Sequence, residues 1–380
     1  MWMKILLNAI NVIGTGAQVV VRNILSTMPV MSPEDSFVAI LPDGFGYETL
    51  ATQDNLQTHY IPRSRYHILS RLEDLYVNIP NWCRKFDVDA CFTLGDIGPA
   101  KLPVPQVVLL HQPWIVYREP QIEAQWPYPE RWKLWYSRWQ FRQMMRHCAA
   151  VFVQTPVMAS RMRQLYGVAP KKVHVILQTV PEHVQVMASK KVKPNNHMIE
   201  VDKPCRLLFL AAGYEHKNHS ILPALVQKLR QRGLADLVHI FVTLDPAARK
   251  YEHHLLDSLA SHSDCVTNLG RLKMNQVPGA YAAAHALFMP TLVESFGLIY
   301  LEAMVNGCPI LTSDRDFARW MCQDLALYFD PLDPVSIVDT LECFLGNGSP
   351  SSYKTRTAER LSGFPDSWDS VAQQYLDVIR

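Results

Sequence analysis

The apolar residues of this chain gather in short runs that alternate with longer stretches of mixed polarity. In the first half, these runs occupy residues 4–9, 37–41, 90–94, 107–110, 151–153 and 173–176. Short runs rich in Val, Ile and Leu predict strands that are buried on both faces of a sheet. After the first run, Gly14-Thr15-Gly16 opens a helical pattern through Val20 and Leu25. Strands that alternate with helices favour a parallel sheet with both faces covered.

The second half repeats this alternation after a polar segment. Residues 186–204 are rich in Lys, Asn and Pro and show little periodicity, which predicts a linker. Further apolar runs then occupy residues 206–211, 238–243, 286–289 and 309–312, with a helical pattern at 220–231. We therefore predict an α/β protein with two Rossmann-like domains, residues 1–185 and 205–365. The helical spacing within 366–380 predicts an amphipathic terminal helix that packs on the first domain.

Composition excludes several classes of protein. The chain has 380 residues, 48% of them hydrophobic and 19% charged, which is the balance of a folded globular protein and a length typical of two domains. A net charge of +2 gives no overall field that would attract nucleic acid. The eight cysteines are scattered and never form a C-x-x-C pair, so we expect reduced thiols in a cytoplasmic protein. The short apolar stretch 5–13 lacks the features of a signal peptide.

The segment 290–304 carries the clearest candidate chemistry. It follows a predicted strand and becomes helical near Gly297, so its backbone N–H groups and the positive end of the helix dipole are expected to seat a phosphate. Glu302 lies in this helix, where it can accept hydrogen bonds from ribose hydroxyls, and Glu294 is placed to hold sugar hydroxyls. At roughly 100° per residue, the two carboxylates are expected about 80° apart and able to face one cleft. The alternative is that both are ordinary surface carboxylates.

These residues form an E-x7-E pattern that surrounds Phe296-Gly297-Leu298 and continues through Glu302-Ala303-Met304, Gly307, Pro309 and Ile310. The pattern resembles the retaining glycosyltransferases of family 4, whose fold is called GT-B. The resemblance implies two Rossmann-like domains facing each other across a cleft, with the acceptor on the first domain and a nucleotide-sugar donor on the second. It also implies that Glu294, Ser295, Phe296, Gly297, Leu298 and Glu302 bind the donor.

The resemblance extends to two loops of the second half. Gly213, His216 and Lys217 follow its first strand, where a lysine can reach a diphosphate as a point charge. Arg271 and Leu272 match the loop that flanks the base in similar enzymes. The alternative for Lys217 is a solvated turn residue.

The first half contributes three further candidates. Gly14 and Gly16 lack the Cβ that would keep a diphosphate or sugar away from the backbone, although a glycine turn is often only a tight turn. His111 follows a buried run and so lies at the carboxyl end of a strand. By resemblance, His111 binds the donor sugar or takes part in catalysis together with Lys217 and Glu294; the alternative is a histidine satisfied by structural hydrogen bonds.

No metal or other cofactor is expected. Asp87-Val88-Asp89 has the D-x-D form that binds a metal in other glycosyltransferases, but it precedes the strand at 90–94 and lies at the amino edge of the sheet. We interpret it as a turn. Lys217 and helix ends are expected to stabilise the leaving diphosphate in place of a metal.

The segment 126–146 contains tryptophans among arginines. Trp132, Trp135 and Trp139 fall on one helical face with basic residues beside them, as in helices that lie on a membrane surface. This segment is therefore a candidate for peripheral contact with the inner face of a membrane. A helix whose tryptophans face a protein core is an equal alternative.

Together these features predict a glycosyltransferase that moves a hexose-type sugar from a nucleotide-diphospho-sugar to a glycan or lipid-linked acceptor. The alternatives are an epimerase or phosphorylase of the same fold, or a non-catalytic protein that binds nucleotide sugars. The sequence specifies neither the base, the sugar nor the acceptor.

Overall fold

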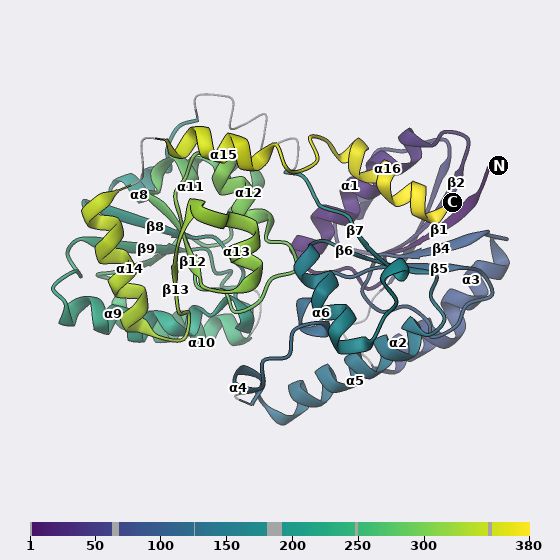
Figure 1. Cartoon of the computed structure of the whole chain (residues 1–380), viewed down its shortest axis with the longest axis horizontal. Helices are drawn as coiled ribbons and strands as arrows, with labels where there is room; N and C mark the ends of the chain where they lie inside the picture. The colour runs from purple at the N-terminus through teal and green to yellow at the C-terminus, as the bar shows by residue number, and fades with distance from the viewer. Residues whose placement is uncertain (1, 63–67, 125, 181–191, 248–249, 349–351) are drawn as a thin grey trace. The chain divides into compact units, whose positions relative to one another are not determined.

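The computed structural model describes residues 2–62, 68–124, 126–180, 192–247, 250–348 and 352–380. The chain folds into two compact units, Met1–Pro181 with Pro365–Arg380, and Glu182–Phe364. Each unit is built on a parallel sheet of its own (Figure 1). The expected linker 186–204 lies outside the described residues up to position 191. Its remainder contains the short helix α8 (Asn196–Ile199), which packs against α11 (Val277–Ala283).

The sheet of the first unit has the order β3-β2-β1-β4-β5-β6-β7, with every neighbouring pair parallel. Its strands are β1 (Lys4–Asn8), β2 (Ser36–Pro42), β3 (Leu56–Ile61), β4 (Ala90–Thr93), β5 (Gln106–Leu109), β6 (Ala150–Val153) and β7 (Val173–Val175). Its central strands are almost completely buried, because helices cover both faces.

Helices α1 and α16 pack together on one side of this sheet, and the helices labelled α2, α3, α5 and α6 lie on the other (Figure 1). The helices of the unit are α1 (Thr15–Met31), α2 (Ile68–Glu73), α3 (Ile79–Lys85), α4 (Pro120–Glu123), α5 (Tyr128–Met145), α6 (Pro156–Tyr166) and α16 (Trp368–Ile379). Local sequence sets their ends. In α6, for example, Thr155 Oγ1 accepts a hydrogen bond from Met158 N at 3.2 Å, and Gly167 ends the helix at φ 63°.

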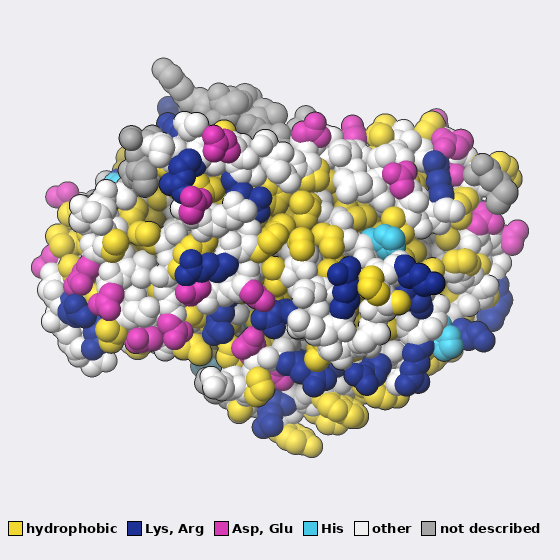
Figure 2. Space-filling view, viewed as in Figure 1, with side chains coloured by type: hydrophobic (Ala, Val, Ile, Leu, Met, Phe, Trp, Pro, Cys, Tyr) yellow, Lys and Arg dark blue, Asp and Glu magenta, His cyan; other side chains and the backbone are white. Residues whose placement is uncertain are grey.

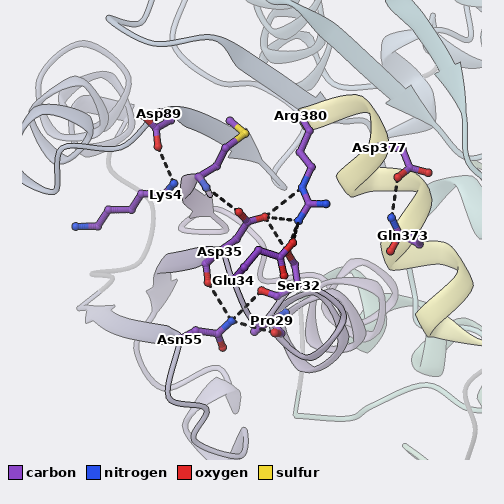
Figure 3. A network of polar contacts seen from close by, with 11 residues as sticks. Lys4, Pro29, Ser32, Glu34, Asp35, Asn55, Asp89, Gln373, Asp377 and Arg380 are labelled. Carbon is purple, nitrogen blue, oxygen red and sulfur yellow. Dashed lines mark hydrogen bonds and ion pairs between the residues drawn. The ribbon is translucent and has the colours of Figure 1, made fainter. Parts of the chain in front are cut away.

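The last helix, α16, is fastened to the first unit by a polar cluster (Figure 3). Arg380 donates from Nη2 to Asp35 Oδ2 at 2.8 Å, and it also binds Ser32 and Glu34. Asp35 is fully buried and accepts a further hydrogen bond from Met3 N at 2.7 Å. This cluster ties α16 to the loop that follows α1.

The second unit repeats the architecture with the sheet order β10-β9-β8-β11-β12-β13. Its strands are β8 (Cys205–Phe209), β9 (Val238–Val242), β10 (Val266–Asn268), β11 (Ala286–Met289), β12 (Ile310–Ser313) and β13 (Ala326–Phe329). Its longer helices are α9 (Leu222–Gln231), α10 (Lys250–Leu259), α12 (Leu298–Val305), α13 (Asp316–Cys322), α14 (Pro334–Asn347) and α15 (Tyr353–Leu361). None of the helices in the described ranges has the length and apolar character needed to cross a membrane.

Candidate functional site

The second unit brings Lys217 and Glu294 together. Lys217 ends the short 3-10 helix Glu215–Lys217 after β8, and Glu294 lies in the loop between β11 and α12. The ammonium of Lys217 donates to the carboxylate of Glu294, and Thr291 Oγ1 lies 3.3 Å from the same carboxylate. The two side chains are largely buried, with 17% and 9% of their surfaces exposed. An oriented positive charge therefore lies at the carboxyl edge of the sheet, where parallel α/β folds bind ligands.

Asn218, which the sequence analysis did not single out, holds this loop in place. It adopts the left-handed conformation with φ 65° and is buried. Its Nδ2 donates to the carbonyl oxygens of Pro290 at 3.1 Å and Pro331 at 2.7 Å, which follow β11 and β13. One side chain thus ties three loops together at one edge of the sheet. An Asn directly after the basic pair, in a position that needs positive φ, was the available signal.

The N-terminus of α12 lies three residues beyond Glu294. Its N-cap is Gly297 at φ 81°, a residue that has no side chain with which to cap the first turn. A Cβ at Gly297 would stand 2.6 Å from Tyr300 Cδ2, so both the backbone conformation and the space require glycine. Backbone N–H groups at the positive end of a helix dipole suit an anion. Glu294 precedes the helix, so the value of roughly 100° per residue, from which the angle of about 80° was expected, does not apply between it and Glu302.

Glu302 occupies a different environment from Glu294. It is half-buried on α12, and Tyr281 of α11 donates from its hydroxyl to Glu302 Oε2 at 3.4 Å. Burial raises the pKa of Glu302 to about 7, and the hydrogen bond from Tyr281 opposes the shift only in part. The carboxyl group therefore changes charge near neutral pH.

The remaining predicted residues of this unit differ in their exposure and packing. Arg271 is exposed and Leu272 is half-buried, directly after Gly270 at φ 71°. The space beside Gly213 is filled by Glu252, whose Cγ would stand 2.3 Å from an added Cβ, so packing already requires this glycine.

The carbonyl of His216 accepts hydrogen bonds from Leu292 N at 2.8 Å and Thr291 Oγ1 at 3.1 Å, which join its loop to the segment before Glu294. The ring of His216 stacks on Tyr214 with centroids 5.5 Å apart. His216 therefore supports the loop through its backbone carbonyl, independently of any role of its imidazole ring.

The side chains around Gly297 do not all point toward a ligand. Phe296 is 3% exposed and packs edge-on against Phe364 with ring centroids 6.0 Å apart. A ligand can meet Phe296 only through its backbone. Ser295 precedes Phe296 in the sequence and Leu298 follows Gly297, and both side chains are half-buried.

In the first unit, His111 lies at the carboxyl end of β5 between residues from both neighbouring strands. Asp96, after β4, accepts hydrogen bonds at Oδ1 from His111 N at 2.6 Å and Gln112 N at 2.7 Å. Gln154, after β6, places its amide Nε2 3.0 Å from His111 Nδ1. Because an amide N–H donates, Nδ1 accepts and the ring hydrogen resides on Nε2. That Nε2 has no hydrogen-bond partner among the described residues.

Burial lowers the pKa of His111, and the Asp96 carboxylate and the Leu94 carbonyl oppose this shift without reversing it. His111 is therefore neutral at pH 7, and its Nε2 atom is buried. Asp96 has φ 66°, an uncommon value for a residue with a side chain, and its two hydrogen bonds to backbone N–H groups hold it there.

Gly14 and Gly16 begin α1 directly after β1. Gly14 is the N-cap, with φ −79° and ψ 137°, a conformation open to any residue. At Gly16 an added Cβ would meet nothing within 4 Å, so packing inside the described chain does not require glycine there. The absence of a Cβ at Gly16 leaves the first turn open to an approaching group.

The D-x-D segment has a structural role. Asp89 Oδ2 accepts a hydrogen bond from Lys4 N at 2.8 Å (Figure 3), and Asp89 N donates to Lys4 O at the same distance. Asp87 takes the positive φ of 51° that the turn requires. Asp89 thus joins the start of β1 to the start of β4.

Comparisons with known proteins agree with this architecture. Residues 194–360 match the family described as "Glycosyl transferases group 1", and residues 16–181 match "Glycosyltransferase Family 4". The O-antigen chain mannosyltransferase RfbU of Salmonella typhimurium is 24% identical over 204 residues, which are 53% of this chain and 52% of that protein. The MMP alpha-(1->4)-mannosyltransferase of Mycolicibacterium hassiacum is 25% identical over 77% of this chain and 70% of its own length. The match to the first of these relatives thus spans about half of that protein's length.

Solved structures match over nearly the whole chain. Sucrose-phosphate synthase of Thermosynechococcus elongatus superposes with a TM-score of 0.72 at 15% identity, covering 99% of this chain and 98% of that one. Anabaena Alr3699/HepE, solved in complex with UDP and glucose, gives a TM-score of 0.70 at 14% identity with the same coverage. Two Rossmann-like units, each with candidate residues at the carboxyl edge of its sheet, define the GT-B class. With both halves matched by their family models, the chain belongs to the family 4 glycosyltransferases.

Proposed function

We propose that this chain transfers a hexose-type sugar from a nucleotide-diphospho-sugar to a glycan or lipid-linked acceptor. The observation that carries the proposal is the ion pair of Lys217 and Glu294 beside the N-terminus of α12, whose N-cap is Gly297. An ammonium group and the backbone N–H groups at a helix N-terminus are what a diphosphate requires of its binding site. The mannosyl transfer named for two relatives and the UDP named in a complex of a structural neighbour support this choice of donor.

In the proposed reaction, the bond between the anomeric carbon and the diphosphate oxygen breaks, and negative charge develops on the diphosphate. Lys217 and the N-terminus of α12 stabilise that charge. These groups are fixed before the donor arrives, because Glu294 and Asn218 hold the loop that carries Lys217. With this positive charge in place, we propose that no metal is obligatory.

The other candidates have distinct proposed roles. Glu302 accepts hydrogen bonds from the ribose hydroxyls, and Glu294 holds hydroxyls of the sugar. His111 donates from Nε2–H to a sugar hydroxyl or to the reacting group. Retention of the anomeric configuration rests on the resemblance to family 4.

The first test is a thermal-shift screen of UDP-, GDP- and ADP-sugars, because a ligand that binds the folded state raises its Tm. The stabilising donor is then incubated with and without acceptors, and release of the nucleoside diphosphate is measured in the presence and absence of EDTA. Lys217→Ala and Glu302→Ala are expected to abolish release. Glu359→Ala, at an exposed carboxylate of the same unit, is the matched control.

Three results would count against the proposal. The first is that no nucleotide sugar stabilises the protein. The second is that Lys217→Ala releases product at the rate of the unmodified protein. The third, loss of activity in EDTA that Mg²⁺ or Mn²⁺ restores, would reject metal independence alone. The anomeric proton in an NMR spectrum of the product shows whether configuration is retained.

A further inference from the structure

Helix α5 exposes a stripe of large aromatic side chains. Tyr128 is 76% exposed, Trp132 46%, Trp135 59% and Trp139 42%. At about 100° per residue, these positions fall within an arc of about 60° on the helix. The stripe therefore forms one continuous apolar face, and the alternative of tryptophans directed into the core is wrong.

The fold does not need this face for its own packing. On the opposite side of α5, the residues Leu134, Phe141, Met144 and Met145 are buried in the first unit. Arg138 anchors the helix through hydrogen bonds to Glu123 Oε1 at 2.8 Å and Trp114 O at 3.0 Å. A helix that is already packed and anchored still presents an exposed apolar stripe, and such patches mark interaction surfaces.

Positive charge lies on the same face. Arg131, Arg142 and Arg146 are exposed and fall within or beside the aromatic arc. The acidic residue of the helix, Glu130, projects to another side and is paired with Lys133 at 2.6 Å. Figure 2 shows Lys and Arg side chains along this edge of the first unit, with hydrophobic side chains protruding beside them. The charge of the face therefore matches an anionic partner.

The aromatic rings indicate which kind of anionic partner fits. Trp132 stacks on Tyr136 with centroids 5.4 Å apart and planes 3° apart, and Tyr136 stacks on Trp139 at 5.7 Å and 20°. These contacts arrange the rings in a row along the helix, and each tryptophan keeps two fifths or more of its surface exposed. Such a row, with arginines beside it, suits the boundary between lipid headgroups and acyl chains, where Trp and Tyr are enriched.

We propose that the exposed face of α5, formed by Tyr128, Trp132, Trp135, Trp139, Arg131, Arg142 and Arg146, docks on the surface of an anionic lipid bilayer. The aromatic edges enter the headgroup region, and the guanidinium groups bind lipid phosphates. The helix lies along the membrane surface. This inference rests on α5 alone, so its test is independent of the proposed sugar transfer.

The test is co-sedimentation of the full chain with vesicles of phosphatidylcholine and with vesicles that also contain phosphatidylglycerol. Binding to the anionic vesicles is expected, with a blue shift of tryptophan fluorescence and a decline as salt increases. Trp132→Ser/Trp135→Ser/Trp139→Ser is expected to lose at least about tenfold in affinity. Trp2→Ser, at a tryptophan 69% exposed outside α5, is the matched control.

Charge is tested separately with Arg131→Glu/Arg142→Glu/Arg146→Glu, which is expected to abolish vesicle binding. Lys101→Glu/Lys273→Glu/Lys354→Glu makes the same change in net charge at exposed positions outside the face and is expected to retain binding. Circular dichroism confirms that each variant is folded. If the tryptophan variant fails to fold, vesicle binding of the arginine variant, compared with its lysine control, tests the proposal.

The proposal is overturned if the chain does not bind anionic vesicles, or if the α5 variants bind them as well as their controls do. Light scattering supplies a further check. If the chain is a dimer that the tryptophan variant converts to a monomer, the face is an interface between two copies and the membrane assignment is wrong. The membrane assignment is also wrong if the chain binds a soluble acidic oligosaccharide but no vesicles, and the tryptophan variant loses the binding of that oligosaccharide.

Discussion

Gln154 Nε2 lies 3.0 Å from His111 Nδ1 and determines which ring nitrogen of the histidine carries the hydrogen. Because the amide donates, His111 keeps its hydrogen on Nε2 and can donate it. We expect Gln154→Glu to reverse this arrangement: a carboxylate accepts from Nδ1–H and also raises the pKa of His111. Transfer activity should fall by about tenfold or more if Nε2–H serves the reaction.

The ¹⁵N chemical shifts of the His111 ring report the tautomer directly, with His111→Gln used to assign the signal. Gln154→Leu is the control, because it removes the donor without supplying an acceptor and should lower activity less than Gln154→Glu. A ring that keeps its hydrogen on Nε2 in Gln154→Glu would show that Gln154 does not control the tautomer.

Lys217 is expected to recognise the diphosphate specifically. Lys217→Ala should weaken binding of a nucleoside diphosphate by about 10- to 100-fold, the worth of hydrogen bonds to a charged group, and leave binding of the nucleoside unchanged. Calorimetric Kd values for the two ligands separate these effects. Equal losses for both ligands would indicate a damaged fold instead.

The same substitution leaves the largely buried carboxylate of Glu294 without its cation, which should cost on the order of 3 kcal/mol of stability. Lys217→Ala/Glu294→Gln removes that unpaired charge. It should recover stability in urea denaturation without recovering affinity for the diphosphate. Recovery of both would place the role of Lys217 in folding alone.

The buried strands could be predicted from the sequence, whereas three strands at sheet edges could not. β3, β10 and β13 lie at the ends of their sheets and escaped prediction. Most of their side chains are only partly buried, so no continuous apolar run marks them. Central strands such as β1 and β9 are covered on both faces and stood out for that reason.

Residues of the candidate site could be predicted where the residue type itself indicates a chemical role, such as a charge or a helix start. Lys217 and the helix start at Gly297 fall into this group. Asp96, Gln154 and Asn218 were missed because they act on other protein groups, through contacts between loops far apart in the sequence. Such contacts follow from the order of strands in the sheet, which the sequence pattern alone does not provide.

Glu302 makes stability depend on pH. Its pKa is about 7 in the folded protein, above its ordinary value of 4.5, so the group favours folding while protonated. The contribution is fully present below pH 4.5 and is lost as pH rises through 7, by at most about 3 kcal/mol. Glu302→Gln should therefore raise the Tm at pH 8 more than at pH 5. The control Glu359→Gln should show no such difference.

Nucleotide binding should also release protons at pH 7, because ribose hydroxyls favour the ionised carboxylate of Glu302. Calorimetry in two buffers of different ionisation enthalpy measures this release. An apparent binding enthalpy that is the same in both buffers would separate Glu302 from the ribose.

Arg380 should stabilise the first unit through Asp35, and the effect should disappear in acid. Burial raises the pKa of Asp35, but hydrogen bonds from Arg380, Met3 N and Ser32 outweigh it and hold the pKa below its ordinary value. The stabilisation is therefore present at neutral pH and is lost as pH falls through the lowered pKa.

Arg380→Ala should cost about 1–3 kcal/mol in urea denaturation at pH 7, and less below pH 3. Arg230→Ala, in an exposed pair, should cost less than about 1 kcal/mol. If Arg380→Ala is equally costly at both pH values, the helix is held by packing and not by this charge pair.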